Sequence, residues 1–211
     1  MNAGTKLAAL GLLLPNVLGA QGLLEQFSYE GLRFTAIGAD AGIVVSDALT
    51  AEPTVGVRLD LGWFAPKIRL VVGGSYFRGA YNAEEITRFE NQLEAVIGGG
   101  TPIDLGTIKL TSWQAFLDLH YLPAPNGRMR PYGGLGLGIH VRDGDGAAID
   151  DTFVEDALDT IAAGLAAVLG IEVGIAGRVS WTAEARGDLT SELLSASFRT
   201  GFMVAFPQGN R

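Results

Sequence analysis

The chain has 211 residues, of which 48% are hydrophobic and 18% are charged, and it carries a formal net charge of −8 with a pI near 4.7. This length allows one domain with a full core or two small domains, and the acidic balance argues against nucleic-acid binding as the main function. The sequence contains no cysteine, which excludes disulfides, thiolate metal ligands, a cysteine nucleophile and a lipidated cysteine.

Residues 1–20 have the layout of a secretory signal peptide. Lys6 gives a weakly positive start, residues 7–14 form a short apolar core, and small residues lead to Ala20. The apolar core is too short to cross a bilayer, and a buried N-terminal helix is the alternative interpretation. We predict export with cleavage after Ala20, followed by a periplasmic lead-in over residues 21–31.

Eight later segments alternate apolar residues with polar or small ones at a period of two, which predicts strands with two unlike faces. The last of them, residues 194–206, has a second face that is mostly small and carries the single charge of Arg199. Such a strand fits an apolar face against lipid and a small polar face inside a narrow barrel. The first strand changes frame, and a β-bulge near Gly38 would reconcile its two halves. The eight segments lie near residues 32–45, 54–63, 68–77, 112–121, 129–142, 165–176, 179–188 and 194–206.

The connections between these strands alternate in length. Those after the second, fourth and sixth strands are short and contain Pro, Asn or Gly, whereas those after the third and fifth are long. Each long connection carries a capping-box pattern for a short helix, Asn82 with Glu85 and Thr152 with Glu155. Both helices have an apolar stripe, and we expect them to lie across the barrel mouth.

Together these segments predict an all-β fold. The predicted architecture is an eight-stranded antiparallel up-and-down transmembrane β-barrel over residues 32–206, with short helices in the two long extracellular loops and a C-terminal tail over residues 207–211. Eight is an even number, and each strand is close to the 9–11 residues of a tilted membrane strand. With both termini in the periplasm, such a barrel has short periplasmic turns and longer outer loops. A soluble β-sandwich is the alternative.

Aromatic side chains on the outward rows are expected to form two belts, one at each water interface of a bilayer. In a soluble β-sandwich these residues would have no reason to sort by height. The belt on the short-turn side contains Trp63, Tyr121, Trp181 and Phe206, and the belt on the long-loop side contains Tyr76, Trp113 and Phe198.

The chain resembles the small eight-stranded outer-membrane β-barrel family, of the type formed by the transmembrane domains of outer-membrane proteins A and X. The final strand from Phe198 to Phe206, the glycine-spaced strand from Pro131 to Gly138 and the signal peptide carry this resemblance. It implies localisation in the cell outer membrane of a Gram-negative bacterium, contact with membrane lipid and lipopolysaccharide, and recognition of the last strand by the outer-membrane assembly machinery. The family usually ends on its terminal aromatic residue, whereas residues 207–211 follow here.

The inward rows bring nearly balanced acidic and basic side chains into the barrel. Charges held away from water must be paired and hydrogen-bonded, and an eight-stranded barrel is just wide enough for side chains to fill it. We therefore predict a polar network that fixes the barrel, and a narrow ion path lined by the same groups is the alternative. The predicted members are Asp40, Arg58, Asp60, Arg69, Asp118, His120, Arg130, Glu172, Glu184, Arg186 and Arg199.

The acidic connection over residues 143–159 holds the candidate metal ligands. Its start resembles a calcium-binding loop, but the later positions of that pattern carry no ligand. A solvated acidic loop is the expected structure, and a weak Ca²⁺ or Mg²⁺ site at the lipopolysaccharide level is the alternative. The candidates are Asp143, Asp145, Asp150 and Asp151.

These features predict an integral outer-membrane protein with a structural or surface-binding role. We expect a monomer without catalysis, cofactor or nucleic-acid partner. A small pore or transporter for ions or small solutes is the alternative. A lipid-modifying enzyme would need a Ser/His/acid set, and neither His120 nor His140 has such partners at catalytic spacing.

Overall fold

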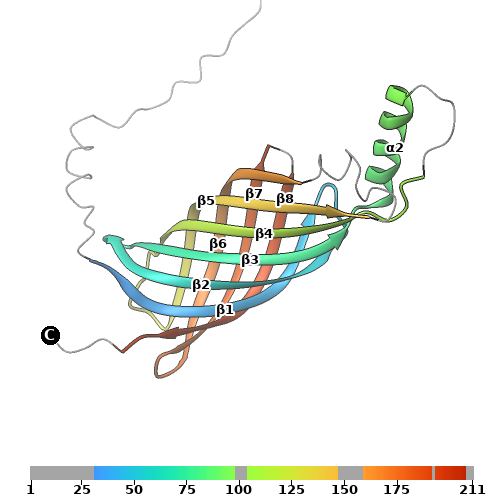
Figure 1. The fold of residues 1–211 in the computed structure, drawn as a ribbon. Coiled ribbons are helices and arrows are strands. Elements are labelled where there is room, and N and C mark those ends of the chain that lie inside the picture. Colours follow the sequence, from blue (N-terminus) through green and yellow to red (C-terminus); the bar gives the residue numbers. More distant parts are fainter. Residues whose placement is uncertain (1–30, 98–103, 147–158, 192, 208–211) are drawn as a thin grey trace, which may run out of the picture.

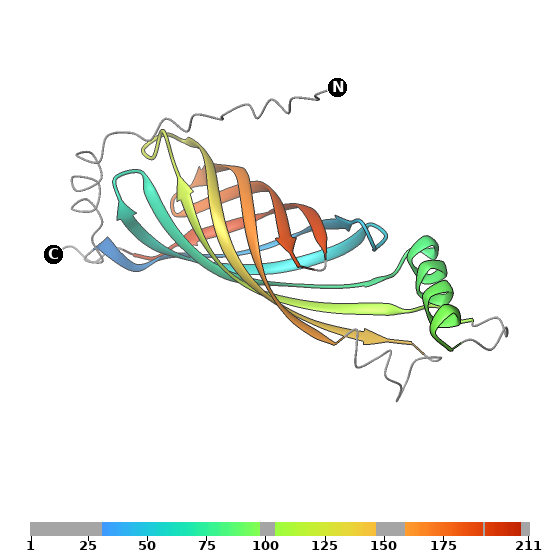
Figure 2. The same ribbon diagram turned by 90° about the horizontal axis from the view of Figure 1, so that it is seen from above.

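The computed structural model describes residues 31–97, 104–146, 159–191 and 193–207. Eight strands follow one another in sequence order, each antiparallel to the next, and the last pairs with the first. The result is a closed up-and-down barrel (Figures 1 and 2). The fold class predicted from the period-two pattern is therefore confirmed. The predicted signal peptide lies outside the described residues.

The barrel strands run from 12 to 17 residues in length. They are β1 (Leu32–Ser46), β2 (Glu52–Ala65), β3 (Ile68–Ala80), β4 (Lys109–Tyr121), β5 (Met129–Asp145), β6 (Thr160–Ala176), β7 (Val179–Thr190) and β8 (Leu194–Ala205). The described helix α2 (Ala83–Ile97) lies between β3 and β4. The helix predicted for the second long loop falls largely on residues 147–158, outside the described part. Among the described helical residues, none form a segment long and apolar enough to span a bilayer.

The alternating pattern gives every strand an inward and an outward face. On β8, Phe198 and Phe202 are each 56% exposed, whereas Arg199 between them is 2% exposed. Because the sheet closes on itself, the backbone groups of every strand find partners on both sides, and the barrel has no free edge along its closed part.

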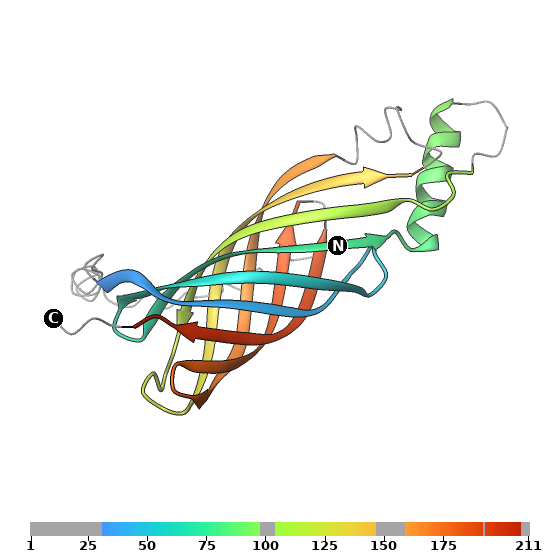
Figure 3. The same cartoon turned by 60° about the horizontal axis from the view of Figure 1, so that its bottom comes forward.

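One end of the barrel, here called the turn side, carries the compact connections. Residues 66–67 and 177–178 make two-residue turns, in which Lys67 and Gly177 adopt positive φ angles of 65° and 53°. Such left-handed conformations are typical of tight hairpins. The opposite end, here called the loop side, carries the two long connections (Figure 3). The predicted alternation of short and long connections is present.

The loop side is uneven in height. The pairing of β3, β4 and β5 continues to Ala80, Lys109 and Asp145, beyond the residues that β2 and β7 pair. Figure 2 shows these strands running past the closed part of the barrel toward α2. The period-two prediction placed the start of β4 and β6 several residues later. In β4 the alternation is reversed, since Lys109 faces outward and Leu110 inward, and in β6 Ala162 and Ala163 make both faces small and apolar.

The irregularity of β1 is present but lies elsewhere than predicted. The register with β2 shifts between Leu32 and Ala36, where Gly62 of β2 takes a φ of 86°. Gly38 sits in the regular part of the strand. A Cβ there would lie 2.2 Å from the Met203 sulfur, so this glycine makes room for packing across the β1–β8 seam and does not form a bulge.

Helix α2 begins as the capping pattern predicts. The Asn82 side-chain oxygen accepts a hydrogen bond from the Glu85 backbone N–H at 2.9 Å, which satisfies one of the free N–H groups of the first turn. The Asn82 amide also donates to the Asp47 carbonyl oxygen at 3.2 Å, so the cap ties the helix to the neighbouring β1–β2 loop.

The expectation that this helix lies across the barrel mouth is wrong for α2. Its apolar stripe, which includes Phe89 and Leu93, packs against Leu105, Ile108 and Tyr81 of the same connection. The helix stands beyond the ends of β3 and β4 (Figure 1). Because residues of its own loop already cover this apolar stripe, packing α2 into the lumen would bury no further part of the stripe.

Apolar side chains from three other places fill the loop-side mouth. Leu49 from the β1–β2 loop, Leu110 from β4 and Leu193 from the β7–β8 loop form one buried cluster, here called the loop-side cap. Phe77 and Tyr81 pack against it. The Ser46 hydroxyl accepts a hydrogen bond from the Leu49 N–H at 2.9 Å, which fixes the loop that supplies the first leucine.

Candidate functional site

Four charged residues at mid-height form the central cluster, defined as Asp40, Arg58, Glu184 and Arg199. Arg58 lies 2.7 Å from Asp40 and 2.7 Å from Glu184, and Arg199 lies 2.9 Å from Glu184. The Tyr132 hydroxyl donates a further hydrogen bond to Glu184 at 2.8 Å. Glu184 therefore accepts from two guanidinium groups and one phenol, and every charge in the cluster faces its opposite.

The closed sheet explains why these four side chains meet. Glu184 and Arg199 are direct partners in the β7–β8 register, and Asp40 pairs with Gly56 and Gly201 on its two sides. The two glycines leave the space that the Asp40 and Arg199 side chains occupy, since a Cβ on Gly56 would lie 2.7 Å from an Asp40 oxygen. The central cluster therefore combines side chains from neighbouring strands with side chains that face one another across the lumen.

A second group lies toward the loop side and centres on Arg186. Its guanidinium is 2.7 Å from Asp118 and 2.9 Å from Asp188, and it stacks 4.6 Å from the centre of the Phe116 ring. Gln114 donates to Asp188 at 2.7 Å. The guanidinium is thus held by two carboxylates and an aromatic face, which suits its planar shape and delocalised charge.

A third group, here called the turn-side cluster, comprises Asp60, Arg69, Arg130, Glu172 and Ser180. Arg69 lies 3.2 Å from Asp60 and 2.8 Å from Glu172. Arg130 contacts the other Glu172 oxygen and lies 3.0 Å from the Ser180 hydroxyl. The Asp60 carboxylate also accepts from the Gly62 N–H at 2.7 Å.

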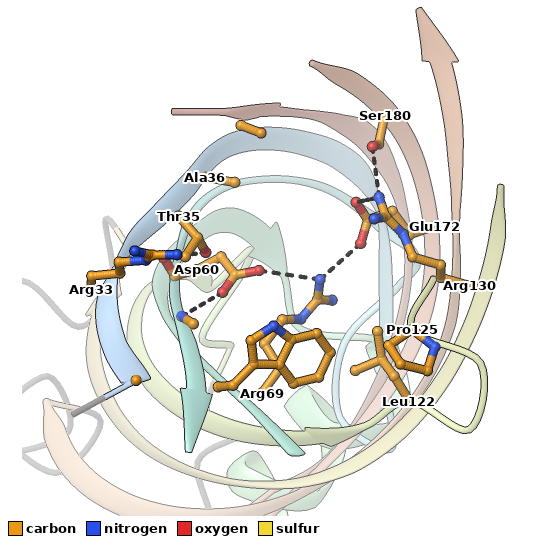
Figure 4. A pocket seen from close by; sticks show the side chains of 14 residues that line it. Arg33, Thr35, Ala36, Asp60, Arg69, Leu122, Pro125, Arg130, Glu172 and Ser180 are labelled. Atoms are coloured by element: carbon orange, nitrogen blue, oxygen red, sulfur yellow. Dashed lines mark hydrogen bonds and ion pairs between the residues drawn. The ribbon is translucent and has the colours of Figure 1, made fainter. Parts of the chain in front are cut away.

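Two cavities lie on either side of the central cluster. The turn-side cavity has a volume of about 410 Å³ and is lined by the turn-side cluster together with Arg33, Trp63, Leu122 and Pro125 (Figure 4). The loop-side cavity measures about 20 Å³, which is room for about one water molecule. Arg199 of the central cluster and Leu193 of the loop-side cap line the loop-side cavity.

The two histidines are interior residues. The His120 ring stacks on Tyr132 with 4.6 Å between ring centres, and its Nε2 lies 3.7 Å from an Asp118 oxygen. His140 Nε2 lies 3.3 Å from the Gln114 amide nitrogen. Their polar contacts are with an amide and a carboxylate, and neither contact is to a serine hydroxyl.

Every residue predicted for the interior network faces inward and contacts another charged or polar side chain of the network. Sequence reasoning missed Gln114, Tyr132 and Asp188, which complete the contacts of the first two groups. It also missed Arg142, which lies 3.0 Å from the Thr190 hydroxyl. The signal for them was present, because all four lie on the inward rows. Gln114 and Tyr132 are uncharged, so charge alone does not reveal them, and Asp188 and Arg142 stand near the strand ends.

The predicted belt residues lie on the outer surface, with the exception of Trp63. The register of β2 with β3 shifts between Asp60 and Trp63, so Trp63 pairs with the inward residue Arg69 and lines the turn-side cavity instead of the outer wall. Tyr121 and Phe206 are exposed on the turn side, and on the loop side Tyr76 packs 4.5 Å from Trp113. Phe198 is exposed next to Arg199 of the central cluster and therefore lies nearer mid-height than the predicted loop-side belt, and Trp181 is half-buried near the turn side. Phe34 is also exposed on the turn side, and the frame change of β1 hid it from the sequence pattern.

Two of the candidate metal ligands are described, and both are exposed. Asp145 forms an ion pair with Arg78 at 2.7 Å, and Asp143 precedes it by two residues on the same outward row. Asp150 and Asp151 lie outside the described residues. Within residues 31–97, 104–146, 159–191 and 193–207, no group of three or more histidine or acidic side chains is arranged to hold a metal ion.

Solved structures of outer-membrane barrels are similar to this chain, whereas sequence comparisons give no match. No family model matches the chain, and no curated protein sequence does. Among solved structures, Neisserial surface protein A (NspA) matches with a TM-score of 0.56 and 12% identity over 81% of this chain and 96% of that one. The outer membrane protein OprG from Pseudomonas aeruginosa matches with a TM-score of 0.56 and 15% identity over 85% and 99%. The chain therefore has the fold of the small eight-stranded outer-membrane β-barrels.

Proposed function

We propose that this protein is an integral outer-membrane β-barrel with a structural or surface-binding role and a lumen filled by its own charged side chains. The observation that carries the proposal is the combination of an apolar outer wall with an ion-paired interior. Leu135 and Leu169, on neighbouring strands, are 72% and 70% exposed, while Arg186 and Arg199 are each 2% exposed. A protein folded in water has the opposite arrangement.

The outer wall fits a hydrocarbon environment. Exposed leucine, isoleucine and valine side chains lie on every strand except β3, where Leu70 and Val72 are half-buried. Together they form an apolar area much larger than the patches of water-soluble monomers. A closed barrel satisfies all its backbone hydrogen bonds internally, which the bilayer core requires. The proposed partners are therefore outer-membrane lipid and lipopolysaccharide around a single copy of the chain.

Export and assembly belong to the same proposal. The N-terminal segment supports signal-peptide export, and the final strand supports recognition by the outer-membrane assembly machinery. The terminal aromatic residue is held at the seam, where the Phe206 N–H donates to the Thr35 carbonyl oxygen at 2.8 Å. The closing strand thus ends on a residue that is both aromatic and hydrogen-bonded to β1.

Two experiments test this function. The unboiled protein from a purified outer-membrane fraction should migrate faster on a gel than the boiled protein, because a closed barrel resists detergent. In planar bilayers the purified protein should give no steady ion conductance, because the central cluster and the loop-side cap block the lumen. Equal migration of the two samples would remove the barrel proposal. A stable, salt-dependent conductance would instead establish the small-pore alternative.

Replacing Leu137 with arginine is expected to destabilise the barrel in lipid vesicles by about 2–4 kcal/mol, because the charge would lie at the middle of the hydrocarbon layer. Leu137 is 58% exposed and pairs with Leu117, midway between Trp113 and Tyr121 on β4. Urea unfolding in vesicles measures the change.

The matched control is Met129→Arg, which places the same charge at the turn-side end of β5, where the cost should fall to about 0–1 kcal/mol. Met129 is 59% exposed, so burial inside the protein does not distinguish the two sites. Equal free energies of unfolding for the two variants would show that the wall does not face a bilayer.

A further inference from the structure

The turn-side cavity has the features of a ligand site. Its volume of about 410 Å³ lies within the range of small-molecule pockets. It opens at the end of the barrel that carries the short turns, and Gly31 and Ala205, from the first and last parts of the described chain, line its rim. Ion pairs of Arg69 with Asp60 and Glu172 contribute to its lining.

The charges around this cavity do not balance. Its lining contains three guanidinium groups, from Arg33, Arg69 and Arg130, and two carboxylates, from Asp60 and Glu172. Figure 4 shows Arg33 and Arg130 on opposite sides of the cavity, with Asp60 and Arg69 between them. One positive charge is therefore in excess at a site where part of the surrounding water has been replaced by protein.

The two carboxylates are already occupied by protein donors, whereas one arginine of the lining, Arg33, is open to the cavity. Arg69 makes both of its ion pairs through Nη1, and Arg130 makes both of its contacts through Nη2. The Nε atoms of Arg69 and Arg130 have no acceptor, but they are themselves buried, so a ligand in the cavity does not reach them. Arg33 is exposed and has no ion pair within the described part of the chain. Arg33 is therefore the guanidinium group of the lining that is open to an anion in the cavity.

The remaining wall is apolar. Trp63, Leu122 and Pro125 line the cavity beside the guanidinium groups. Guanidinium groups bind carboxylates and phosphates through paired hydrogen bonds, and an aromatic and aliphatic wall favours a compact apolar body next to that charge.

We propose that the turn-side cavity binds a small organic acid, with its carboxylate or phosphate group held by Arg33 and its apolar body against Trp63. The site faces the same side as both chain ends, so in an outer-membrane barrel it takes its ligand from the periplasm. Binding at this site does not require that the lumen conduct ions.

The test is calorimetric titration of the full mature chain, refolded in detergent micelles, with four probes. Benzoate and phenyl phosphate carry the two candidate head groups, benzamide is an uncharged analogue of similar shape, and inorganic phosphate lacks the apolar body. We expect at least one of the two aromatic anions to bind at least about tenfold more tightly than benzamide and inorganic phosphate. The tighter of the two identifies the head group. Benzamide binding as tightly as both anions would overturn the proposal, because it would indicate simple partition into an apolar surface.

Arg33→Gln provides the site-specific test. Arg33 is exposed and unpaired in the described structure, so its removal should leave the barrel folded, which the heat-dependent gel shift checks. The variant should bind the preferred anion about tenfold more weakly, and Arg78→Gln, an exposed arginine on the loop side, should bind as the unmodified protein does. Unchanged affinity in Arg33→Gln, or an equal loss in both variants, would contradict the assignment.

Discussion

Replacing Glu184 with leucine is expected to destabilise the barrel by about 3–5 kcal/mol, the usual cost of leaving a buried charge without its partner. Glu184 accepts hydrogen bonds from Arg58, Arg199 and Tyr132 at 2.7–2.9 Å. Its loss would leave two guanidinium groups facing each other with only Asp40 between them. Unfolding by urea in vesicles or micelles, followed by tryptophan fluorescence, measures the change.

The matched control is Asp145→Asn. Asp145 also pairs with an arginine at 2.7 Å, but the side chains of Arg78 and Asp145 are 50% and 62% exposed. An exposed pair contributes about 0–1 kcal/mol, so this variant should unfold almost as the unmodified protein does. If the two substitutions cost the same, the central cluster is not a buried ion-pair network.

Replacing Gly42 with alanine is expected to cost about 3 kcal/mol and to reduce the fraction of protein that closes into a heat-modifiable barrel. Gly42 lies opposite Arg199 in the β1–β8 register. An added Cβ would fall 1.9 Å from the Phe198 carbonyl oxygen and 2.7 Å from the Arg199 Cα. These are backbone atoms of the closing strand, so they cannot move aside without opening the seam.

Gly187→Ala is the control for the glycine prediction. A Cβ at Gly187, which lies on β7, meets nothing within 4 Å, so the change should alter the free energy of unfolding by no more than about 0.5 kcal/mol. Comparable folded fractions for Gly42→Ala and Gly187→Ala would show that the β1–β8 seam tolerates a side chain, against the close approach described here.

The strands and their two faces could be predicted because a period of two is a local property. Alternation in β8 is enough to place Phe198 outside and Arg199 inside, whatever the neighbouring strands are. The same holds for the tight turns and for the start of α2, since the Asn82 cap needs only residues three apart. The exception is β1, whose frame change could be detected but not placed, because the position of a bulge depends on the partner strand.

The sequence by itself also determined that the interior would be charged and nearly balanced, because inward rows can be read without knowing the strand pairing. Only the tertiary structure decided which charges meet. Arg58 and Glu184 are separated by 126 positions in the chain, and their contact exists because a closed barrel brings β2 and β7 to opposite sides of one narrow lumen. Closure likewise decided that leucines, and not α2, fill the loop-side mouth, and that three arginines share one cavity on the turn side. These features depend on register and on distances across the lumen, and no local period encodes either of them.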